Sequence, residues 1–226
     1  MSSSSPEFWS FITRLGEAQI LLPVALALSL WLAWRARATP IVPYWLALLG
    51  IATLITAATK IAFIGWGIGS AALDFTGVSG HAMFAAAIYP VVCRLALSGH
   101  GLALQRLGWG GGLALAGLIA WSRLVVQAHS PSESLIGFLL GGSVSALAIW
   151  IARPRAVPVP WWMPALLVAW FALVPMNAPR SITHDVVTRL ALMLSGRSQP
   201  YLRQDLHRDA GMALDSRVSH SVKVAA

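Results

Sequence analysis

The chain has 226 residues, of which 57% are hydrophobic and 11% are charged. Soluble globular domains carry about 25% charged residues, so this composition argues against a soluble protein and indicates a membrane protein. The formal net charge of +8 comes without a recognisable nucleic-acid-binding motif. This argues against nucleic-acid binding and favours attraction to anionic lipid headgroups.

Apolar stretches of membrane-spanning length, about 17 to 25 residues, follow one another along the chain. We therefore predict an all-α fold, a polytopic membrane helix bundle of about six transmembrane helices. Gly137 and Gly141 predict a small-residue packing face inside this bundle. An interfacial aromatic belt is expected from the tryptophans near the predicted helix ends, which are Trp31, Trp34, Trp45, Trp109, Trp161 and Trp162. The predicted spans are Ala18–Trp34, Ile41–Phe63, His81–Ser98, Leu107–Val126, Leu135–Ile151 and Trp161–Met176.

The predicted transmembrane bundle, residues 18–176, leaves a segment at each end of the chain. Residues 1–17 include "EFWSFITRLGEA", which predicts an amphipathic helix at the membrane surface. Residues 177–226 form a basic C-terminal tail, in which Lys and Arg outnumber Asp and Glu. Because residues 1–6 contain no Lys or Arg, we expect no cleaved signal peptide and expect the first span to direct insertion.

The positions of arginines in the short connections predict the orientation of the bundle. Three alternate connections carry arginine pairs and share one face, which we expect to be cytoplasmic; the pairs are Arg35 with Arg37, Arg94 with Arg106, and Arg153 with Arg155. The connections that hold residues 74–81 and 129–133 then face the other side. In a bacterial inner membrane, that side is the periplasm.

Ionisable side chains at membrane depth are costly and therefore mark functional sites. Outside the arginine-bearing connections, the bundle holds few of them, and they fall at helix ends that meet the same membrane face: Lys60, Asp74, His81, Arg123, His129 and Glu133. Asp74 has the features of an ordinary loop residue. The others, together with a helix start at residues 79–81, converge on one face.

The stretch "FTGVSGHAMF" predicts the start of a helix. Ser79 is a good N-cap residue, and Gly80 and His81 then occupy the first turn, where backbone N–H groups lack intrahelical acceptors. A glycine in such a turn lets an anion approach the backbone. The alternative is a plain helix cap with a histidine at the membrane interface.

The stretch "AHSPSES" predicts a second helix start. Ser130 as N-cap, Pro131 at the first helical position and Glu133 three residues after the cap form a capping box. His129 precedes the cap, so the Glu133 carboxylate can also accept a hydrogen bond from the imidazole and fix which ring nitrogen is free. Capping alone is the structural alternative for Glu133.

Two cations accompany these helix starts. The guanidinium of Arg123 suits phosphate oxygens, and the ammonium of Lys60 has the same use. Either side chain can instead extend to lipid headgroups without a catalytic role. Two histidines, two cations, a carboxylate and a helix N-terminus on one face indicate a site for phosphoryl transfer.

These residues resemble the motifs of the type 2 phosphatidic acid phosphatase family. Its third motif, Ser-Arg, five residues, His, three residues and Asp, is matched from Ser122 to Glu133, with Glu in place of Asp. Its second motif, Pro-Ser-Gly-His, is matched at residues 78–81 with Val in place of Pro. Its first motif is a lysine, six residues and Arg-Pro; here Lys60 is followed at that spacing by Gly67 and Ile68.

The resemblance implies roles for the matched residues. His129 would be the nucleophile that forms a phosphohistidine, with Glu133 orienting its ring, and His81 would protonate the leaving group. Four groups would bind the substrate phosphate: Lys60, Arg123, Ser79 and the N–H of Gly80. The resemblance implies neither a metal nor a cofactor.

We therefore expect an integral membrane phosphatase whose substrate is a lipid phosphate or diphosphate. The alternative is a catalytically weak relative that binds anionic lipid or a membrane partner, because the Arg-Pro pair is missing. A transporter is less favoured, since the polar groups gather at one face instead of at the bilayer midplane. The identity of the lipid and the oligomeric state are left open by the sequence.

Overall fold

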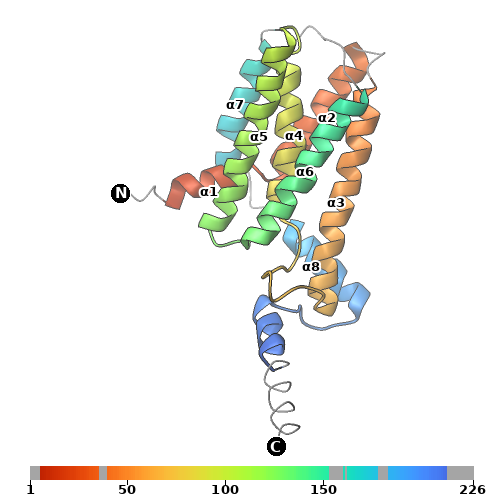
Figure 1. The fold of residues 1–226 in the computed structure, drawn as a ribbon, viewed down its shortest axis with the longest axis vertical. Coiled ribbons are helices and arrows are strands. Elements are labelled where there is room, and N and C mark those ends of the chain that lie inside the picture. Colours follow the sequence, from red (N-terminus) through yellow and green to blue (C-terminus); the bar gives the residue numbers. More distant parts are fainter. Residues whose placement is uncertain (1–5, 36–39, 153–159, 161, 178–182, 213–226) are drawn as a thin grey trace, which may run out of the picture. The chain divides into compact units, whose positions relative to one another are not determined.

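The computed structural model describes residues 6–35, 40–152, 160, 162–177 and 183–212. In this part of the chain, helices are joined by turns and short loops, with an isolated antiparallel bridge between Ser70 and Phe75 (Figure 1). Residues 203–212 are also helical. The named helices are α1 Pro6–Arg14, α2 Ala18–Arg35, α3 Ile41–Trp66, α4 Gly80–Ala96, α5 Leu102–Val125, α6 Pro131–Ala152, α7 Trp162–Asn177 and α8 Thr183–Ser195.

The helices α2 to α7 correspond to the predicted spans, so the fold is the predicted all-α polytopic membrane helix bundle. Apolar stretches long enough to cross a membrane are Pro6–Trp34, Ile41–Trp66, Leu102–Val125 and Pro131–Ala152, and Gly80–Ala96 and Ala165–Val174 are shorter apolar helices. The largest boundary error is at α5, which begins five residues before the predicted Leu107. Gln105 permits this early start, because its buried amide donates to the carbonyl oxygens of Ser98 and His100.

The chain forms two compact units. The first unit comprises Met1–Thr56 and Val78–Ser181, and the second comprises Ala57–Gly77 and Ile182–Ala226. The described part of the predicted C-terminal tail, residues 183–212, is largely helical and belongs to the second unit.

Helix α4 is the centre of the first unit and packs against α2, α5 and α6. Its side chains from Ala82 to Val92 are buried, so α4 is covered by protein along most of its length. A β-carbon added at Gly137 or Gly141 of α6 would lie 2.5 Å from the Ser79 oxygen or 2.1 Å from the Met83 oxygen. The predicted small-residue packing face is therefore confirmed, and it brings α6 against the start of α4.

This close approach predicts that Gly141→Ala destabilises the bundle by about 1–3 kcal/mol, the usual cost of overpacking a core. The neighbouring Gly142→Ala is the matched control, because its added β-carbon would meet only the Leu113 side chain at 3.8 Å. Unfolding in detergent monitored by circular dichroism measures both. Equal midpoints for the two variants would contradict the packing described here.

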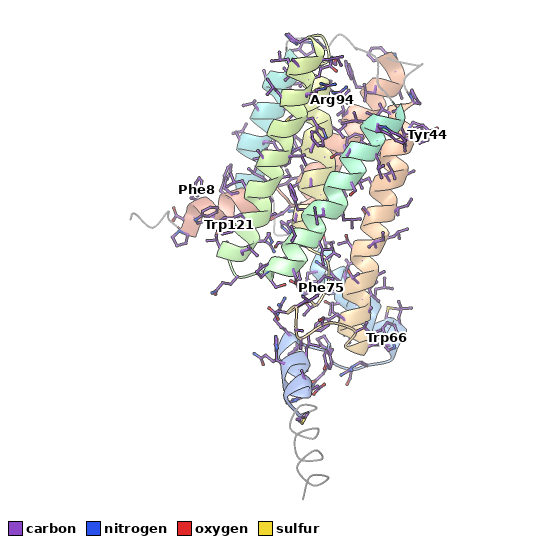
Figure 2. All side chains as sticks on the ribbon, in the orientation of Figure 1. Phe8, Tyr44, Trp66, Phe75, Arg94 and Trp121 are labelled. Carbon is purple, nitrogen blue, oxygen red and sulfur yellow. The ribbon has the colours of Figure 1, made fainter. Side chains whose placement is uncertain are left out.

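The predicted aromatic belt is wrong for Trp45. Trp31 and Trp109 are half-buried, and Trp161 lies outside the described residues. Trp34 and Trp162 are exposed as expected, but Trp45 is fully buried and its indole N–H donates to the carbonyl oxygen of Ala87 at 3.0 Å. Hydropathy cannot tell which side of a helix faces protein. The exposed aromatic side chains of α3 are Tyr44 and Trp66 near its two ends (Figure 2).

The second unit has its own small core of Phe63, Ile64, Ala191 and Leu206. Asp74, expected to be an ordinary loop residue, has a structural role here. Its carboxylate forms ion pairs with Arg203 and with His207, which lie in the helical segment 203–212. Part of the predicted tail is therefore attached to the loop that precedes residues 78–81.

Candidate active site

The candidate site in the first unit is built from the end of α5, the start of α6 and the start of α4. Residues 126–130 connect α5 to α6 in a tight turn in which Gln127 has a positive φ of 55°. The N–H groups of Ala128 and His129 donate to the carbonyl oxygen of Arg123 at 3.0 and 3.3 Å. The turn therefore holds the histidine close to the end of the helix that carries the arginine.

The predicted capping box at the start of α6 is confirmed. The N–H of Ser130 donates to Glu133 Oε2 at 3.1 Å, and the N–H of Glu133 donates to Ser130 Oγ at 3.3 Å. Pro131 is the first helical residue, as predicted. The reciprocal hydrogen bonds fix the Glu133 side chain, which is fully buried.

The same carboxylate oxygen also contacts the histidine. Nδ1 of His129 lies 2.7 Å from Glu133 Oε2, and the imidazole is 13% exposed. An ionised carboxylate only accepts hydrogen bonds, so Nδ1 carries the proton and Nε2 presents its lone pair. The buried carboxylate beside the ring also stabilises positive charge on the imidazole.

The start of α4 lies beside this histidine–carboxylate pair. The N–H of Ser79 donates to the carbonyl oxygen of Glu133 at 3.1 Å, which joins the second motif to the third. Ser79 is the N-cap residue, as predicted, but its side chain makes no capping hydrogen bond. Its Oγ is buried and has no hydrogen-bond partner among the described residues, so this hydroxyl is available to a ligand.

Gly80 and His81 form the first turn of α4. A β-carbon added at Gly80 would have Thr56 as its near neighbour, at 3.8 Å, so the glycine leaves space at the helix start. Gly16, in the turn after α1, packs against the backbone and β-carbon of His81. The imidazole is half-buried.

Arg123 has a partner that the sequence analysis missed. Its Nη1 donates to Thr13 Oγ1 at 3.1 Å, and Ser122 Oγ lies 3.0 Å from the same oxygen. The Arg123 Nε is buried and has no hydrogen-bond partner among the described residues. No family motif covers residues 1–17. The sequence indicates this contact only through the polar Thr13, which follows the apolar Ile12 in the predicted amphipathic helix.

The amphipathic helix predicted in residues 1–17 is present as α1, but it does more than lie on a surface. It packs against α5, and Ile12 and Leu15 are buried. Thr13 is thereby placed next to Arg123, so α1 contributes a positioning residue to the site.

Thr13→Val is expected to raise KM about two- to tenfold with little change in kcat. The isosteric change removes a hydrogen bond that orients the guanidinium, and such a bond contributes about 0.5–1.5 kcal/mol. Steady-state phosphate release measures both constants. Thr13→Ser should restore the wild-type KM, and a fall in kcat at unchanged KM would argue against a role in substrate binding.

Lys60 is a residue of the second unit, in the part of α3 assigned to Ala57–Gly77. There the backbone of Gly77 packs closely on its side chain: an added β-carbon would lie 2.9 Å from Lys60 Cγ. The structure therefore groups His129, Glu133, Arg123 and residues 79–81 in the first unit. The role of Lys60 stays a prediction from the motif.

The missing arginine of the first motif has a structural explanation. Gly67, at that position, has a φ of 70°, which disfavours residues with a side chain. A β-carbon there would also lie 3.0 Å from the ring of Tyr201. The end of α3 is thus built around a glycine and a tail tyrosine, and an arginine would be strained here.

Fold and geometry together define a polytopic membrane protein with a histidine–carboxylate pair and buried hydrogen-bond donors at its helix ends. The comparisons with known proteins agree with this class. Residues 59–157 match the PAP2 superfamily. The "Uncharacterized 22.5 kDa protein in cps region" of Klebsiella pneumoniae is 34% identical over 206 residues, covering 89% of this chain and 99% of the relative.

The chain therefore belongs to the PAP2 superfamily, as its motifs predicted, and this membership supports a phosphatase-type function. No solved structure matches the chain.

Proposed function

We propose that this protein is an integral membrane lipid phosphatase that hydrolyses a lipid phosphate or diphosphate monoester through a phosphohistidine intermediate. The observation that carries the proposal is the 2.7 Å contact between His129 Nδ1 and the buried Glu133 carboxylate. A glutamate that only caps a helix does not need to accept a second hydrogen bond from an imidazole. With the Nδ1 proton directed at the carboxylate, the ring lone pair is on Nε2, in the connection that leads into α6.

In the first step, Nε2 of His129 attacks the phosphorus atom and forms a P–N bond. The P–O bond to the lipid breaks, and the leaving oxygen takes a proton from His81. In the second step, His81 removes a proton from water as the water oxygen attacks the phosphohistidine. Inorganic phosphate leaves, and both histidines return to their starting states.

Charge on the transferring phosphoryl group is balanced by fixed donors. The unpartnered Ser79 hydroxyl and Arg123 Nε support this role, because each is a buried donor without an acceptor among the described residues. The Gly80 N–H at the start of α4 adds the helix dipole. Lys60 is assigned the same function by the motif, and no metal is required in this scheme.

The substrate reaches the site from the bilayer in this proposal. The chain is a multi-pass membrane protein, and we place it in a bacterial inner membrane with residues 126–133 at the periplasmic face. Cysteine labelling tests this orientation in a Cys93→Ala background. Ala128→Cys should react with a membrane-impermeant maleimide in spheroplasts and Gly99→Cys should not; the reverse pattern would invert the topology.

Purified protein in detergent tests the activity. Phosphate release is measured on undecaprenyl diphosphate, phosphatidylglycerol phosphate, phosphatidic acid and a lipid A phosphate, each with and without a chelator. Turnover of a lipid that survives the chelator supports the proposal. Release that depends on added metal would refute the mechanism.

A second candidate function is supported by Gly67, which stands where the family has an arginine. With one cation fewer, the protein could bind anionic lipid, or a membrane partner, without hydrolysing a phosphate. Folded protein that binds members of the lipid panel but releases no phosphate would favour this candidate.

A further inference from the structure

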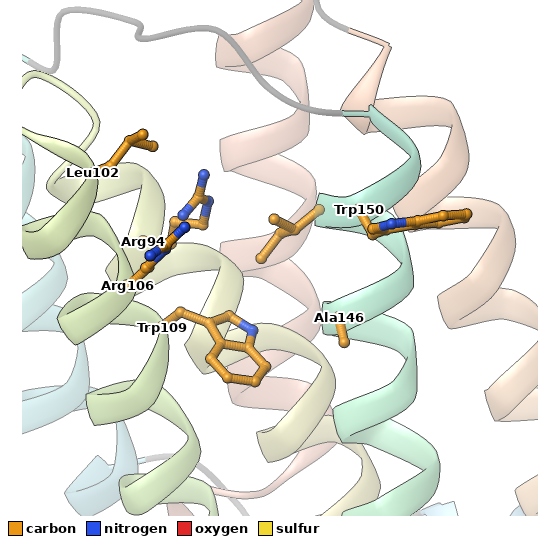
Figure 3. Close-up of a pocket in the computed structure, with 7 residues that line it drawn as sticks. Arg94, Leu102, Arg106, Trp109, Ala146 and Trp150 are labelled. Atoms are coloured by element: carbon orange, nitrogen blue, oxygen red, sulfur yellow. The ribbon is translucent and has the colours of Figure 1, made fainter.

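The first unit holds a cavity at the other end of α6 from Glu133. Its volume is about 550 Å³. It lies between the last turn of α4, the first turns of α5 and the end of α6 (Figure 3). The residues that line it are Arg94, Leu102, Arg106, Trp109, Ala146, Ile149 and Trp150. Glu133 and Trp150 are 17 residues apart, about 25 Å along the helix, so this cavity is separate from the candidate active site.

Two arginines bring like charges together in this cavity. The guanidinium groups of Arg94 and Arg106 lie near each other, and Trp109 lies below them in the close-up (Figure 3). Arg94 Nε and Trp109 Nε1 are buried and have no hydrogen-bond partner among the described residues. A buried donor without an acceptor is destabilising, so these two donors favour a ligand that supplies acceptors.

The first unit contains no carboxylate that could supply this acceptor. Its acidic residues are Glu7, Glu17 and Glu133. Glu133 is bound to His129 at the opposite end of α6, and Glu17 interacts with Arg14 and Gln19. Glu7 lies in α1, which packs at the Arg123 end of α5. No carboxylate of the first unit therefore supplies the counter-charge for Arg94 and Arg106.

The apolar residues that line the cavity indicate which kind of molecule binds there. Leu102 and Trp150 are apolar side chains that are 63% and 68% exposed, and Ile149 lies beside them. Arg94 is two residues from the end of α4, and Figure 2 shows it at one end of the helices of the first unit. Charged side chains at the end of a membrane-spanning helix can extend to the lipid headgroups. A ligand with an anionic head and an apolar body matches both parts of the cavity.

We infer that this cavity binds the phosphate group of an anionic phospholipid, with the arginines and the Trp109 indole as donors and the exposed apolar side chains against the glycerol and acyl chains. Arginine forks match phosphate oxygens in pairs. The inference does not depend on the proposed catalytic function. In the competing account, the two arginines simply extend toward the headgroups of the surrounding lipids. That account predicts no fixed number of bound lipid molecules per protein.

Native mass spectrometry of the full-length protein in detergent tests the inference, with phosphatidylglycerol and phosphatidylcholine added in turn. The wild type should retain one phosphatidylglycerol at concentrations where phosphatidylcholine does not bind. Arg94→Gln with Arg106→Gln should weaken that adduct about tenfold or more, since hydrogen bonds to charged groups are the strong ones. The matched control, Arg189→Gln with Arg197→Gln, removes the same charge from exposed positions of the second unit and should bind like the wild type.

Two further variants protect the test against misfolding or altered topology. Arg94→Lys with Arg106→Lys keeps the charge and should bind with intermediate affinity, and Trp109→Phe should weaken binding by a few-fold. Inorganic phosphate and glycerol phosphate serve as soluble competitors. Displacement of the lipid by either at micromolar concentration would overturn the lipid assignment, and so would equal adducts of both lipids in all variants.

Discussion

His129→Ala is expected to lower phosphate release at least about 10³-fold, because it removes the atom that forms the covalent intermediate. Expression and thermal stability should change little. The imidazole is partly exposed, and its main contact is with Glu133, whose capping hydrogen bonds to Ser130 do not depend on it. Phosphate release on the best lipid of the panel measures the effect.

The matched control is His184→Ala, which removes an exposed imidazole from α8. This variant should retain wild-type activity. Substantial turnover by His129→Ala, from protein that is folded and pure, would exclude His129 as the nucleophile.

Glu133→Gln is expected to separate the two functions of this side chain. Glutamine also occurs at helix position N3 in capping boxes, three residues after the N-cap. The start of α6 and the stability of the protein should therefore be preserved. A neutral amide cannot stabilise positive charge on the His129 ring, and it can force the other ring tautomer. We expect kcat to fall about 10²-fold or more, as for other residues that orient a catalytic histidine.

Glu133→Asp and Glu7→Gln complete this experiment. Aspartate restores the carboxylate found at this position of the family motif and should recover much of the lost kcat. Glu7→Gln makes the same chemical change at an exposed residue of α1 and should have no effect. A Glu133→Gln variant with normal kcat and reduced stability would show that Glu133 is only a helix cap.

The sequence predicted the helices well because the bilayer restricts the possible structures. A chain in lipid must satisfy its backbone hydrogen bonds within each span, so long apolar runs between Arg-rich and Pro-rich segments become helices. The start of α6 was equally predictable. Ser130, Pro131 and Glu133 specify a local capping box, and no distant residue is needed to form it.

The features that the sequence analysis missed all depend on contacts between distant segments. Thr13 reaches Arg123 across 110 positions of the chain, and Trp45 is buried against the backbone of Ala87. The ion pair between Asp74 and Arg203 joins a loop to the predicted tail. Hydropathy and motif spacing describe one segment at a time, so they cannot identify such partners.

The cavity at Arg94 and Arg106 illustrates the same limit. Both arginines were assigned to an orienting connection, which is how the positive-inside pattern is normally interpreted. Only the packing of α4, α5 and α6 shows that they share a cavity with Trp109, and that Arg94 Nε and Trp109 Nε1 lack an acceptor among the described residues.

Trapping of the phosphoenzyme tests the central claim most directly. Protein mixed with a radiolabelled lipid phosphate is quenched in base within a turnover and digested, and the labelled peptide is sequenced by mass spectrometry. The mechanism predicts an acid-labile, base-stable phosphoryl group on His129 that accumulates and decays at rates consistent with turnover. Label on another residue, or steady turnover with no labelled enzyme at any time point, would contradict it.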